Sequence, residues 1–360
     1  MPPMSSLSPL IPGSPAAEGF RMPAEWEPHE ATWLSWPHNH VTWGDHLEGA
    51  EATYVKIISA LTPHETVHVL VANSAVHQRA QQQLSSIRND QHLVFHDIDA
   101  GDTWFRDYGP IFLTREKPRH EIAWTKWIYN AYGNTYEDLL IGNDAPHKMP
   151  LDAWKRFDSG MVLEGGSIDV NGTGTLITTE SCLLSPDRNP GMTKAQIEHT
   201  LKDFLGVTNI LWLSAGIQGD DTTGHVDDIT RFVNQNTVVT VTEKDPQDAN
   251  YVPLAENLKR LKSMSDERGE PITVIEMPMP RPFFVKGRRM AASYANFYIA
   301  NGIVLVPTYN QESDEIALAT LRKCFPDRNA MGIDCRELIW GFGAIHCVTQ
   351  QQPQGIALGT

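Results

Sequence analysis

Short apolar runs alternate with amphipathic segments along most of the chain after residue 20. Apolar residues at helical spacing predict helices, and runs rich in β-branched residues predict strands. The predicted helices span residues 46–61, 75–87, 193–205, 252–264 and 314–325. The predicted strands span residues 66–72, 92–98, 162–170, 174–179, 209–213, 237–241, 272–277, 296–300 and 303–307. This alternation predicts an α/β fold.

Two local signals sharpen this pattern. Asn171 and Gly172 separate two predicted strands, as expected for a hairpin turn. Thr193 followed by Gln196 predicts a capping box at the start of its helix.

The elements recur at intervals of roughly 60–80 residues, which indicates a repeated unit. Because no long linker interrupts them, we expect one domain over residues 21–360.

The first 20 residues form a different kind of segment. They are rich in proline, serine and glycine, and no basic residue precedes Arg21. They also lack the apolar stretch of a signal peptide. We therefore expect residues 1–20 to be a flexible N-terminal arm.

The overall charge narrows the classes of partner. The 360 residues include 29 Lys plus Arg and 44 Asp plus Glu, a formal net charge of −15. An acidic chain is a poor match for nucleic acid or an anionic membrane, and favours a small cationic substrate. Four cysteines are too few for a disulfide scaffold, so we expect a reducing cytoplasm in which a thiol is free to act as nucleophile.

The segment His64-Glu65-Thr66-Val67-His68 matches the zinc-protease pattern H-E-x-x-H. That pattern needs a helix, which places both histidines on one face. Here it runs into the β-branched strand predicted over 66–72, where residues four apart lie about 13 Å from one another. We therefore expect no metal site here, with zinc hydrolysis as the rejected alternative.

A glycine-rich acidic loop at residues 219–228 contains His225 and Asp227. If residues 225–227 are extended, these two side chains point to the same side. An imidazole would then lie beside a carboxylate. The alternative is an acidic, solvated turn.

Near the C-terminus, Cys347 follows Gly341-Phe342-Gly343 and Ala344-Ile345-His346. In an extended chain His346 faces away from Cys347, so its base would come from elsewhere, with His225 as the candidate. The alternative is a buried, inert thiol. The remaining cysteines are expected to be structural: Cys182, Cys324 and Cys335.

Two acidic residues and an asparagine complete the candidates. Asp107 lies in Trp104-Phe105-Arg106-Asp107-Tyr108-Gly109-Pro110, and Glu164 lies beside Gly165-Gly166. Asn296 opens an apolar strand in Ser293-Tyr294-Ala295-Asn296-Phe297. Taken singly, Asp107 could pair with Arg106 and Glu164 could be an edge residue.

Together and in this order, the motifs resemble the agmatine deiminase and bacterial-type peptidylarginine deiminase family, within the guanidino-group-modifying superfamily. The resemblance begins with MPAEWEPHE at residues 22–30 and WLSWP at 33–37. It continues through WFRDYGP, LEGG, GHVDD and SYANF to AIHCVTQQQP, which ends at residue 353. Phe342 within the glycine run, and Tyr108 where many agmatine deiminases have threonine, depart from the family pattern.

The resemblance implies a fold and a set of roles. The fold would be a single-domain α/β propeller of five blades with pseudo-fivefold symmetry. Cys347 would be the nucleophile and His225 the general acid/base, with Asp107, Asp227 and Glu164 holding the guanidinium. Trp104 and Asn296 would line the pocket.

The implied reaction hydrolyses agmatine to N-carbamoylputrescine and ammonia, a step of putrescine synthesis, without metal or cofactor. The same residues would serve free arginine or peptidyl-arginine, and free arginine or a C-terminal arginine would need a cation for its carboxylate. Candidates for that cation are Arg115, Arg119 and Lys126. A non-catalytic binder of cationic ligands is the other alternative. A homodimer is consistent with this family.

Overall fold

Three-stranded units recur along the chain. The computed structural model describes residues 10–87, 90–117 and 119–356. In four sheets of this described part, the first two strands are antiparallel and the third is parallel to the second. Their strands are β4 (Ile111–Arg115), β5 (Glu121–Ile128), β6 (Lys155–Val162), β7 (Ile168–Val170), β8 (Thr175–Thr179), β9 (Asn209–Leu213), β10 (Thr230–Asn234), β11 (Thr237–Thr242), β12 (Thr273–Pro278), β15 (Tyr298–Ala300), β16 (Ile303–Thr308) and β17 (Asn329–Asp334).

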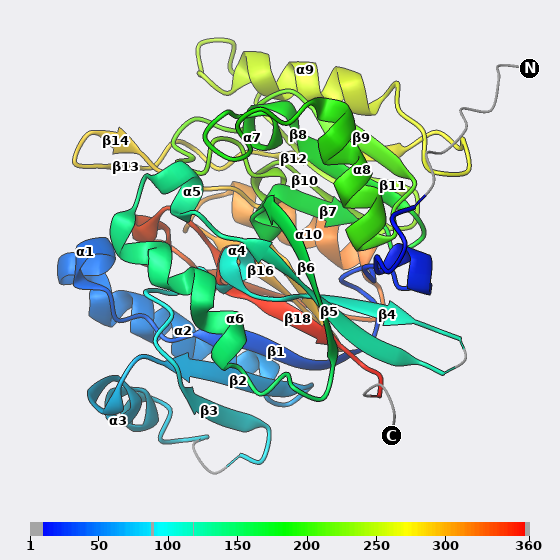
Figure 1. Cartoon of the computed structure of the whole chain (residues 1–360). Coiled ribbons are helices and arrows are strands. Elements are labelled where there is room, and N and C mark those ends of the chain that lie inside the picture. Colours follow the sequence, from blue (N-terminus) through cyan, green and yellow to red (C-terminus); the bar gives the residue numbers. More distant parts are fainter. Residues whose placement is uncertain (1–9, 88–89, 118, 357–360) are drawn as a thin grey trace, which may run out of the picture.

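A fifth sheet joins the two ends of the chain. The C-terminal strand β18 (Gln350–Pro353) pairs antiparallel with β1 (His29–Ser35), as Figure 1 shows. Strand β1 is parallel to β2 (Thr66–Val71), which is parallel to β3 (Leu93–Asp97). The pairing brings the segment that contains Cys347 next to the N-terminal motifs.

Helices connect and cover these sheets (Figure 1). The longer ones are α2 (Leu47–Leu61), α3 (Ser74–Gln83), α8 (Lys194–Leu205), α9 (Tyr251–Leu261) and α10 (Ser313–Cys324). Short helices are α1 (His40–Trp43), α4 (Phe105–Tyr108), α5 (Ala131–Asn134), α6 (Ala145–Lys148), α7 (Glu180–Leu183) and α11 (Ile345–Val348). The 3₁₀ helices are η1 (Ala16–Glu18), η2 (Gly44–His46), η3 (Glu137–Asp144), η4 (Gly165–Ser167), η5 (Val226–Asp228) and η6 (Leu338–Gly341).

Most predicted elements form, with one informative exception. The five predicted helices, the hairpin at Asn171-Gly172 and the capping box of α8 are confirmed. The predicted strand 162–170 is wrong, because β6 ends at Val162 and β7 begins at Ile168. Between them, Gly165 approaches the Arg106 carbonyl so closely that a Cβ would lie 2.2 Å from its oxygen. This close approach bends the chain and turns Glu164 inward.

Part of the N-terminal segment is packed on the body. Phe20 is buried with its ring 5.9 Å from that of Phe157, and the Ile11 amide donates to Asp203. Residues 1–9 lie outside the described residues, so the flexible arm stays a prediction.

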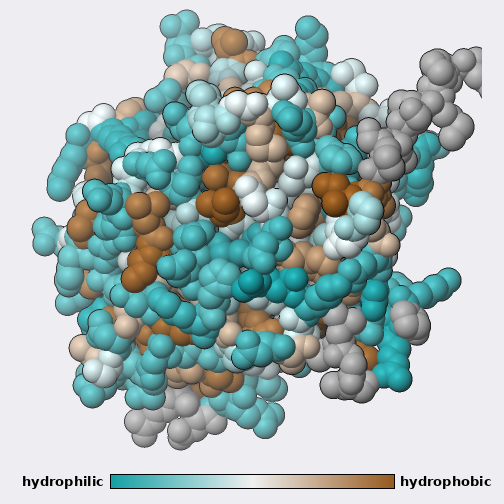
Figure 2. Space-filling model, in the orientation of Figure 1, coloured by the Kyte–Doolittle hydropathy of each residue, from teal (hydrophilic) through white to brown (hydrophobic). Residues whose placement is uncertain are grey.

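The surface agrees with the charge of the sequence. The face in Figure 2 is mainly hydrophilic, with apolar side chains scattered in small groups. No helix within the described residues has the length and apolar character needed to cross a membrane. The expected lack of nucleic-acid binding, the expected dimerisation and the cytoplasmic location stay predictions.

Candidate active site

A pocket opens between loops of the molecule. Its walls are mostly apolar, and its deepest carboxylate and thiol belong to Asp107 and Cys347. It is lined by Val41, Thr42, Trp104, Asp107, Tyr132, Tyr136, Asp138, Leu139, Asp221, Thr222, Gly341, Phe342, Gly343 and Cys347. We call Asp107 and Cys347, together with the buried Glu164, His225 and Asp227 that lie behind the lining, the floor cluster. We call Asp221, Arg288 and Phe342 the mouth cluster.

Helix α4 places Asp107 in the pocket. Both carboxylate oxygens are hydrogen-bonded, one to the Gly166 amide at 2.9 Å and the other to the Tyr132 hydroxyl at 2.8 Å. Burial and the nearby Asp227 raise the pKa of Asp107 well above its ordinary value. A cation is the group that would most relieve this site, because it would compensate two crowded carboxylates.

Tyr132 reaches Asp107 from a strained turn. Its φ is +58°, and the adjacent Ala131 and Asn134 also have positive φ. Non-glycine residues rarely adopt this conformation, which costs about 1–2 kcal/mol each. The fold therefore tolerates backbone strain in the turn that directs the Tyr132 hydroxyl toward Asp107.

Gly166 marks the point where three of the side chains converge. A Cβ at this position would lie 2.6 Å from Nδ1 of His225, 2.8 Å from Oδ1 of Asp107 and 3.0 Å from Oδ2 of Asp227. Only glycine leaves room for all three groups. The structure thus brings the predicted imidazole and both predicted aspartates together.

His225 and Asp227 share this side for a different reason from the one predicted. Residues 226–228 form the 3₁₀ turn η5, not an extended strand, so that assumption is wrong. Neither ring nitrogen of His225 has a hydrogen-bond partner, although Nδ1 lies 3.6 Å from Asp107. Burial lowers the pKa of His225 to about 3 against the opposing effect of Asp227. Its imidazole is therefore neutral at pH 7 and free to take up a proton.

Asp227 is held ionised. Burial raises its pKa, but the hydrogen bond and charge of His346 outweigh this, and the pKa of Asp227 is lowered overall. Its Oδ2 lies 2.6 Å from His346 Nδ1 and 3.8 Å from Cys347 Sγ, while Oδ1 has no partner. The free oxygen is available to a ligand in the pocket.

Glu164 stands at the start of η4 and has one paired and one unpaired oxygen. Oε1 accepts from Arg188 Nε at 2.8 Å, whereas the buried Oε2 has no partner. Burial outweighs Arg188 and raises the pKa of Glu164. Arg188 is itself fixed by Thr222 and Thr223.

Cys347 lies in α11, not in an extended chain, which corrects the second assumption about local geometry. Asn296 holds this helix: its Oδ1 accepts from the His346 and Cys347 amides, and its Nδ2 donates to Cys347 Sγ at 3.1 Å. Burial and the nearby aspartates raise the pKa of the Cys347 thiol well above its ordinary value. The thiol is therefore protonated in the empty pocket.

Asn296 also donates to the buried Asp228 at 3.0 Å. These contacts make Asn296 a support for the thiol. Its side chain is absent from the pocket lining of the described residues, so its predicted role in binding substrate stays a prediction.

His346 is the functional candidate that the sequence analysis dismissed. Its two ring nitrogens contact two carboxylates, Asp227 at 2.6 Å and Glu25 at 2.8 Å. Glu25 is paired in turn with Arg231 at 2.9 Å and Arg106 at 3.3 Å. The sequence signal for His346 was its position next to Cys347. A helical turn over residues 345–348, instead of an extended chain, would have predicted that His346 points toward the site.

Trp104 forms a wall of the pocket. Its ring stacks on Trp43 with centroids 5.8 Å apart, and a Cβ at Gly341 or Gly343 would lie within 2.7 Å of the indole of Trp104. Glycine is required at both positions, and Phe342 between them has φ +74°. This conformation points the Phe342 ring toward the pocket mouth, where it is part of the lining.

Other sequence candidates lie away from the floor. In H-E-T-V-H, residues 66–71 form β2 as predicted, and His68 stacks on Trp33 at 4.0 Å. Glu65 accepts from Thr32 and the Asn301 amide. Arg115, Arg119 and Lys126, the proposed partners of a substrate carboxylate, do not line the pocket of the described residues.

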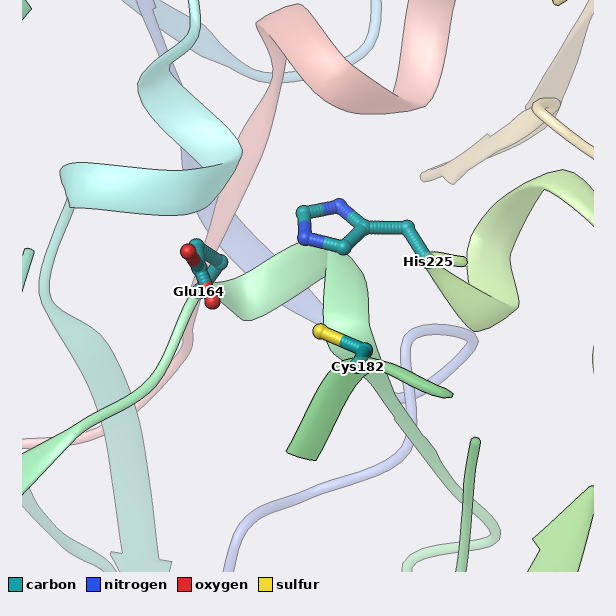
Figure 3. A group of neighbouring side chains, drawn as sticks. All are labelled: Glu164, Cys182 and His225. Atoms are coloured by element: carbon teal, nitrogen blue, oxygen red, sulfur yellow. The ribbon is translucent and has the colours of Figure 1, made fainter. Parts of the chain in front are cut away.

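Two trios of side chains bring possible metal ligands within 4.8 Å: Glu164, Cys182 and His225, and Asp227, Asp228 and Cys347. Figure 3 shows the Cys182 sulfur and the His225 ring pointing toward Glu164. Cys182 lies in α7, and burial raises the pKa of its thiol well above its ordinary value. Both trios share residues with the floor cluster, so the predicted absence of a metal needs direct analysis.

Comparison with known proteins finds relatives that cover nearly the whole chain. The model of the Porphyromonas-type peptidyl-arginine deiminase family matches residues 21–353. The agmatine deiminase of Medicago truncatula is 37% identical over 94% of this chain and 98% of its own length. That of Pseudomonas aeruginosa is 36% identical over 94% and 97%. The solved agmatine deiminase of Enterococcus faecalis has a TM-score of 0.88 and 32% identity, covering 96% of this chain and all of its own.

Proposed function

The chain belongs to the Porphyromonas-type peptidyl-arginine deiminase family, and we propose that it hydrolyses agmatine to N-carbamoylputrescine and ammonia. The carrying observation is the convergence of two aspartates and an imidazole around Gly166, beside a buried thiol. Relatives named agmatine deiminase cover nearly the whole chain and support this assignment.

We propose further that the five sheets are the blades of a propeller. The support is their common strand order, in which an antiparallel pair precedes a parallel one, together with the pairing of β18 and β1 across the chain ends. In this arrangement the segment that precedes the first strand of each unit would contribute to one central site. Residues 21–360 would then form one catalytic domain.

Substrate binding begins with the guanidinium. Its planar nitrogens donate to Asp107, to Oδ1 of Asp227 and to Oε2 of Glu164, the last two of which are buried and unpaired. Such paired, charge-assisted bonds fix the guanidinium plane and leave one face of its carbon open to sulfur. The Trp104 indole forms an adjacent wall.

The first chemical step joins sulfur to carbon. The bound cation lowers the thiol pKa, because it compensates the aspartates that raise that pKa in the empty site. Sγ of Cys347 gives up its proton and attacks the guanidinium carbon. The neutral His225 takes up this proton and delivers it to the departing nitrogen. The C–N bond breaks, ammonia leaves, and a covalent S-alkylthiouronium remains.

The second step releases the product. His225, again neutral, removes a proton from water, and the oxygen attacks the thiouronium carbon. The C–S bond breaks as the carbonyl forms and the remaining hydroxyl proton is released to solvent, His225 returns its proton to the thiolate of Cys347, and the neutral ureido product leaves. Apart from the site's own groups, the chemistry needs only water.

The direct test is formation of ureido product and ammonia from agmatine, free arginine and an arginine-terminated peptide. We expect turnover of agmatine and a loss of at least about 10⁴-fold in the Cys347→Ser variant, because serine is a far weaker nucleophile. Cys324→Ser is the matched control, since this thiol is half-buried at the end of α10.

Exclusive turnover of arginine or peptide would keep the mechanism and reassign the substrate. Full activity of the Cys347→Ser variant would contradict the proposed nucleophile. Metal analysis of the purified protein, with activity measured after chelation, tests the prediction that no metal is needed.

A further inference from the structure

Three side chains of metal-binding type meet behind the lining of the pocket, and the protein leaves several of their donor atoms unused. Oε2 of Glu164 and both ring nitrogens of His225 are buried without a hydrogen-bond partner. The Cys182 sulfur points toward the same place, and the donor atoms of the three side chains lie within 4.8 Å of one another (Figure 3). We call these residues the Cys182 trio. Because unpaired buried polar atoms are costly, a ligand that engaged them would stabilise this site.

The chemical types of these atoms favour one class of ligand. Thiolate sulfur, imidazole nitrogen and carboxylate oxygen are the ligands that Zn²⁺ takes in proteins, and three protein ligands leave a fourth position for water. The harder cations Mg²⁺ and Ca²⁺ need sets of oxygen ligands, which the Cys182 trio does not supply. The trio therefore matches Zn²⁺ or a divalent transition metal of similar preference.

The local fold holds the cysteine and the histidine of the trio next to each other. The Thr179 hydroxyl accepts from the Cys182 amide at 3.3 Å and donates to the carbonyl of Gly224, the residue before His225, at 2.6 Å. A Cβ on Gly224 would lie 2.3 Å from Oγ of Ser181, so glycine is needed for this close approach. One hydroxyl thus joins the two segments that carry the sulfur and the imidazole.

The charges around the trio favour a cation. The charged groups that act most strongly on the Cys182 thiol are the carboxylates of Glu164, Asp220 and Asp107 and the guanidinium of Arg188. Arg188 binds Oε1 of Glu164 at 2.8 Å and leaves Oε2 free. A positive ion at the trio would therefore offset an excess of negative charge, with a carboxylate oxygen already available to it.

The other group of possible ligands is a weaker candidate. We call Asp227, Asp228 and Cys347, whose donor atoms also lie within 4.8 Å of one another, the Cys347 trio. Oδ2 of Asp227 is bonded to His346, and the Asn296 amide donates to both Oδ1 of Asp228 and Sγ of Cys347. A metal at the Cys347 trio would have to displace these bonds, whereas the Cys182 trio offers unpaired atoms.

We propose that the Cys182 trio is an inhibitory binding site for Zn²⁺. The ion would bind Oε2 of Glu164, a ring nitrogen of His225 and the sulfur of Cys182, and the thiol proton would pass to solvent. Two groups of the proposed reaction would then be occupied, the carboxylate that receives the guanidinium and the imidazole that transfers protons. Inhibition therefore rests on the proposed function, whereas metal binding does not. The reaction itself would still need no metal.

Inhibition of the metal-free enzyme by ZnCl₂ is the first test. Cys182→Ser should keep the activity of the metal-free enzyme and raise the Zn²⁺ concentration for half inhibition at least about 100-fold, because it removes a metal ligand. Cys335→Ser is the matched control, since this thiol is equally buried and belongs to neither trio. Inhibition of Cys182→Ser at the same Zn²⁺ concentration as the wild type would overturn the proposal.

Competition with substrate is the second test. High concentrations of agmatine should relieve the inhibition by Zn²⁺. So should n-butylguanidine, which has the same reacting group and no distal cation, because the competition is for the floor cluster. Inhibition by Zn²⁺ that neither compound relieves would overturn the assignment of the metal to Glu164 and His225.

Cobalt identifies the ligands without turnover. Co²⁺ accepts the same donor types and gives a thiolate charge-transfer absorption in the near ultraviolet when a cysteine binds it. We expect this absorption in the wild type and in Cys347→Ser, and its loss in both Cys182→Ser and Cys182→Ala. Cooperative thermal unfolding shows that each variant is folded. Absorption that survives in both Cys182 variants, or that is lost in Cys347→Ser, would overturn the proposal.

The two proposals fail separately. A cobalt absorption that requires Cys182 would support the metal site even in a protein that does not act on agmatine. Turnover of agmatine that Zn²⁺ does not inhibit, in a protein without the cobalt absorption, would overturn the metal site and leave the deiminase assignment in place.

Discussion

The floor cluster and the mouth cluster are two ends of one pocket built in opposite ways. The floor side chains are buried, and the carboxylates among them accept short hydrogen bonds, such as the 2.6 Å contact between Asp227 and His346. In the mouth cluster the contacts are longer, because Arg288 lies 3.7 Å from the centre of the Phe342 ring and 3.8 Å from Asp221, and its side chain is half exposed. Rigid, dry geometry suits covalent chemistry, whereas a solvated ion pair contributes little to binding.

The largest effect should come from breaking the charge network beneath the floor. His346→Gln removes the group between Asp227 and Glu25 and leaves two buried carboxylates without their shared partner. We expect the free energy of unfolding to fall by about 3–5 kcal/mol. We also expect kcat to fall by about 100-fold or more, because Asp227 loses its position. Chemical denaturation and steady-state kinetics measure the two effects.

His199→Gln is the control for this variant. His199 lies in α8, is 35% exposed and pairs at 3.2 Å with the buried Asp203 of the same helix. It should change stability by less than about 1 kcal/mol and leave kcat unchanged. Equal effects of the two histidine variants would contradict a special role for His346.

A smaller effect should follow from weakening one floor contact without disturbing the packing. Tyr132→Phe removes the hydrogen bond to Asp107 and keeps the ring. We expect kcat/KM to fall about 5- to 10-fold, equally for agmatine and n-butylguanidine. The control is Tyr129→Phe. The Tyr129 ring packs edge-on against Tyr132 with centroids 5.5 Å apart, and its substitution leaves the hydrogen bond from Tyr132 to Asp107 in place. A fall in kcat/KM for agmatine without a fall for n-butylguanidine would indicate that Tyr132 acts at the mouth cluster and not at the floor cluster.

The pH dependence separates the two ends of the pocket. The pKa of Asp221 is raised to about 6, so its negative charge is present above pH 6 and is lost as the pH falls through that value. KM for agmatine should therefore rise below pH 6 relative to KM for n-butylguanidine, because Asp221 lines the pocket and agmatine carries one more positive charge. His225, with a pKa of about 3, stays neutral in this window. A constant ratio of the two KM values between pH 5 and 7 would show that the charge of Asp221 does not act on the bound substrate.

The smallest effect concerns the backbone at Phe342. Phe342 has φ +74°, which glycine adopts without strain. Alanine has a Cβ, so the backbone strain present with phenylalanine remains in the alanine variant. We expect Phe342→Gly to be more stable than Phe342→Ala by about 1 kcal/mol, although both lose the contact with Arg288. Thermal unfolding of both variants measures the difference, and an alanine variant as stable as the glycine one would exclude strain.

Sequence reasoning located the five longer helices and many of the strands. The capping box of α8 and the periodicity of α2 are local signals, and both elements formed as predicted. Strands β4 and β5 escaped prediction because both of their faces are largely buried and they carry polar residues such as Lys126 within the strand. Burial on both faces removes the simple alternation of apolar and polar positions.

The site was predicted only where residues lie within recognisable motifs. Asp107, Glu164, His225, Asp227 and Cys347 were named from their motifs. His346 was dismissed because residues 345–348 were assumed to be extended, whereas they form α11. Partners such as Tyr132 and Arg288 have no local signal, because their contacts join segments far apart in the chain.

The central claim is that Cys347 forms a covalent bond to the guanidinium carbon in the floor cluster. Acid quenching of the enzyme during turnover of agmatine, followed by peptide mass spectrometry, tests it directly. We predict that the peptide containing Cys347 gains the mass of agmatine less one ammonia. Cys182, a buried thiol that also lies near His225, should stay unmodified. Turnover with Cys347 unmodified, or with the adduct on Cys182, would contradict the account.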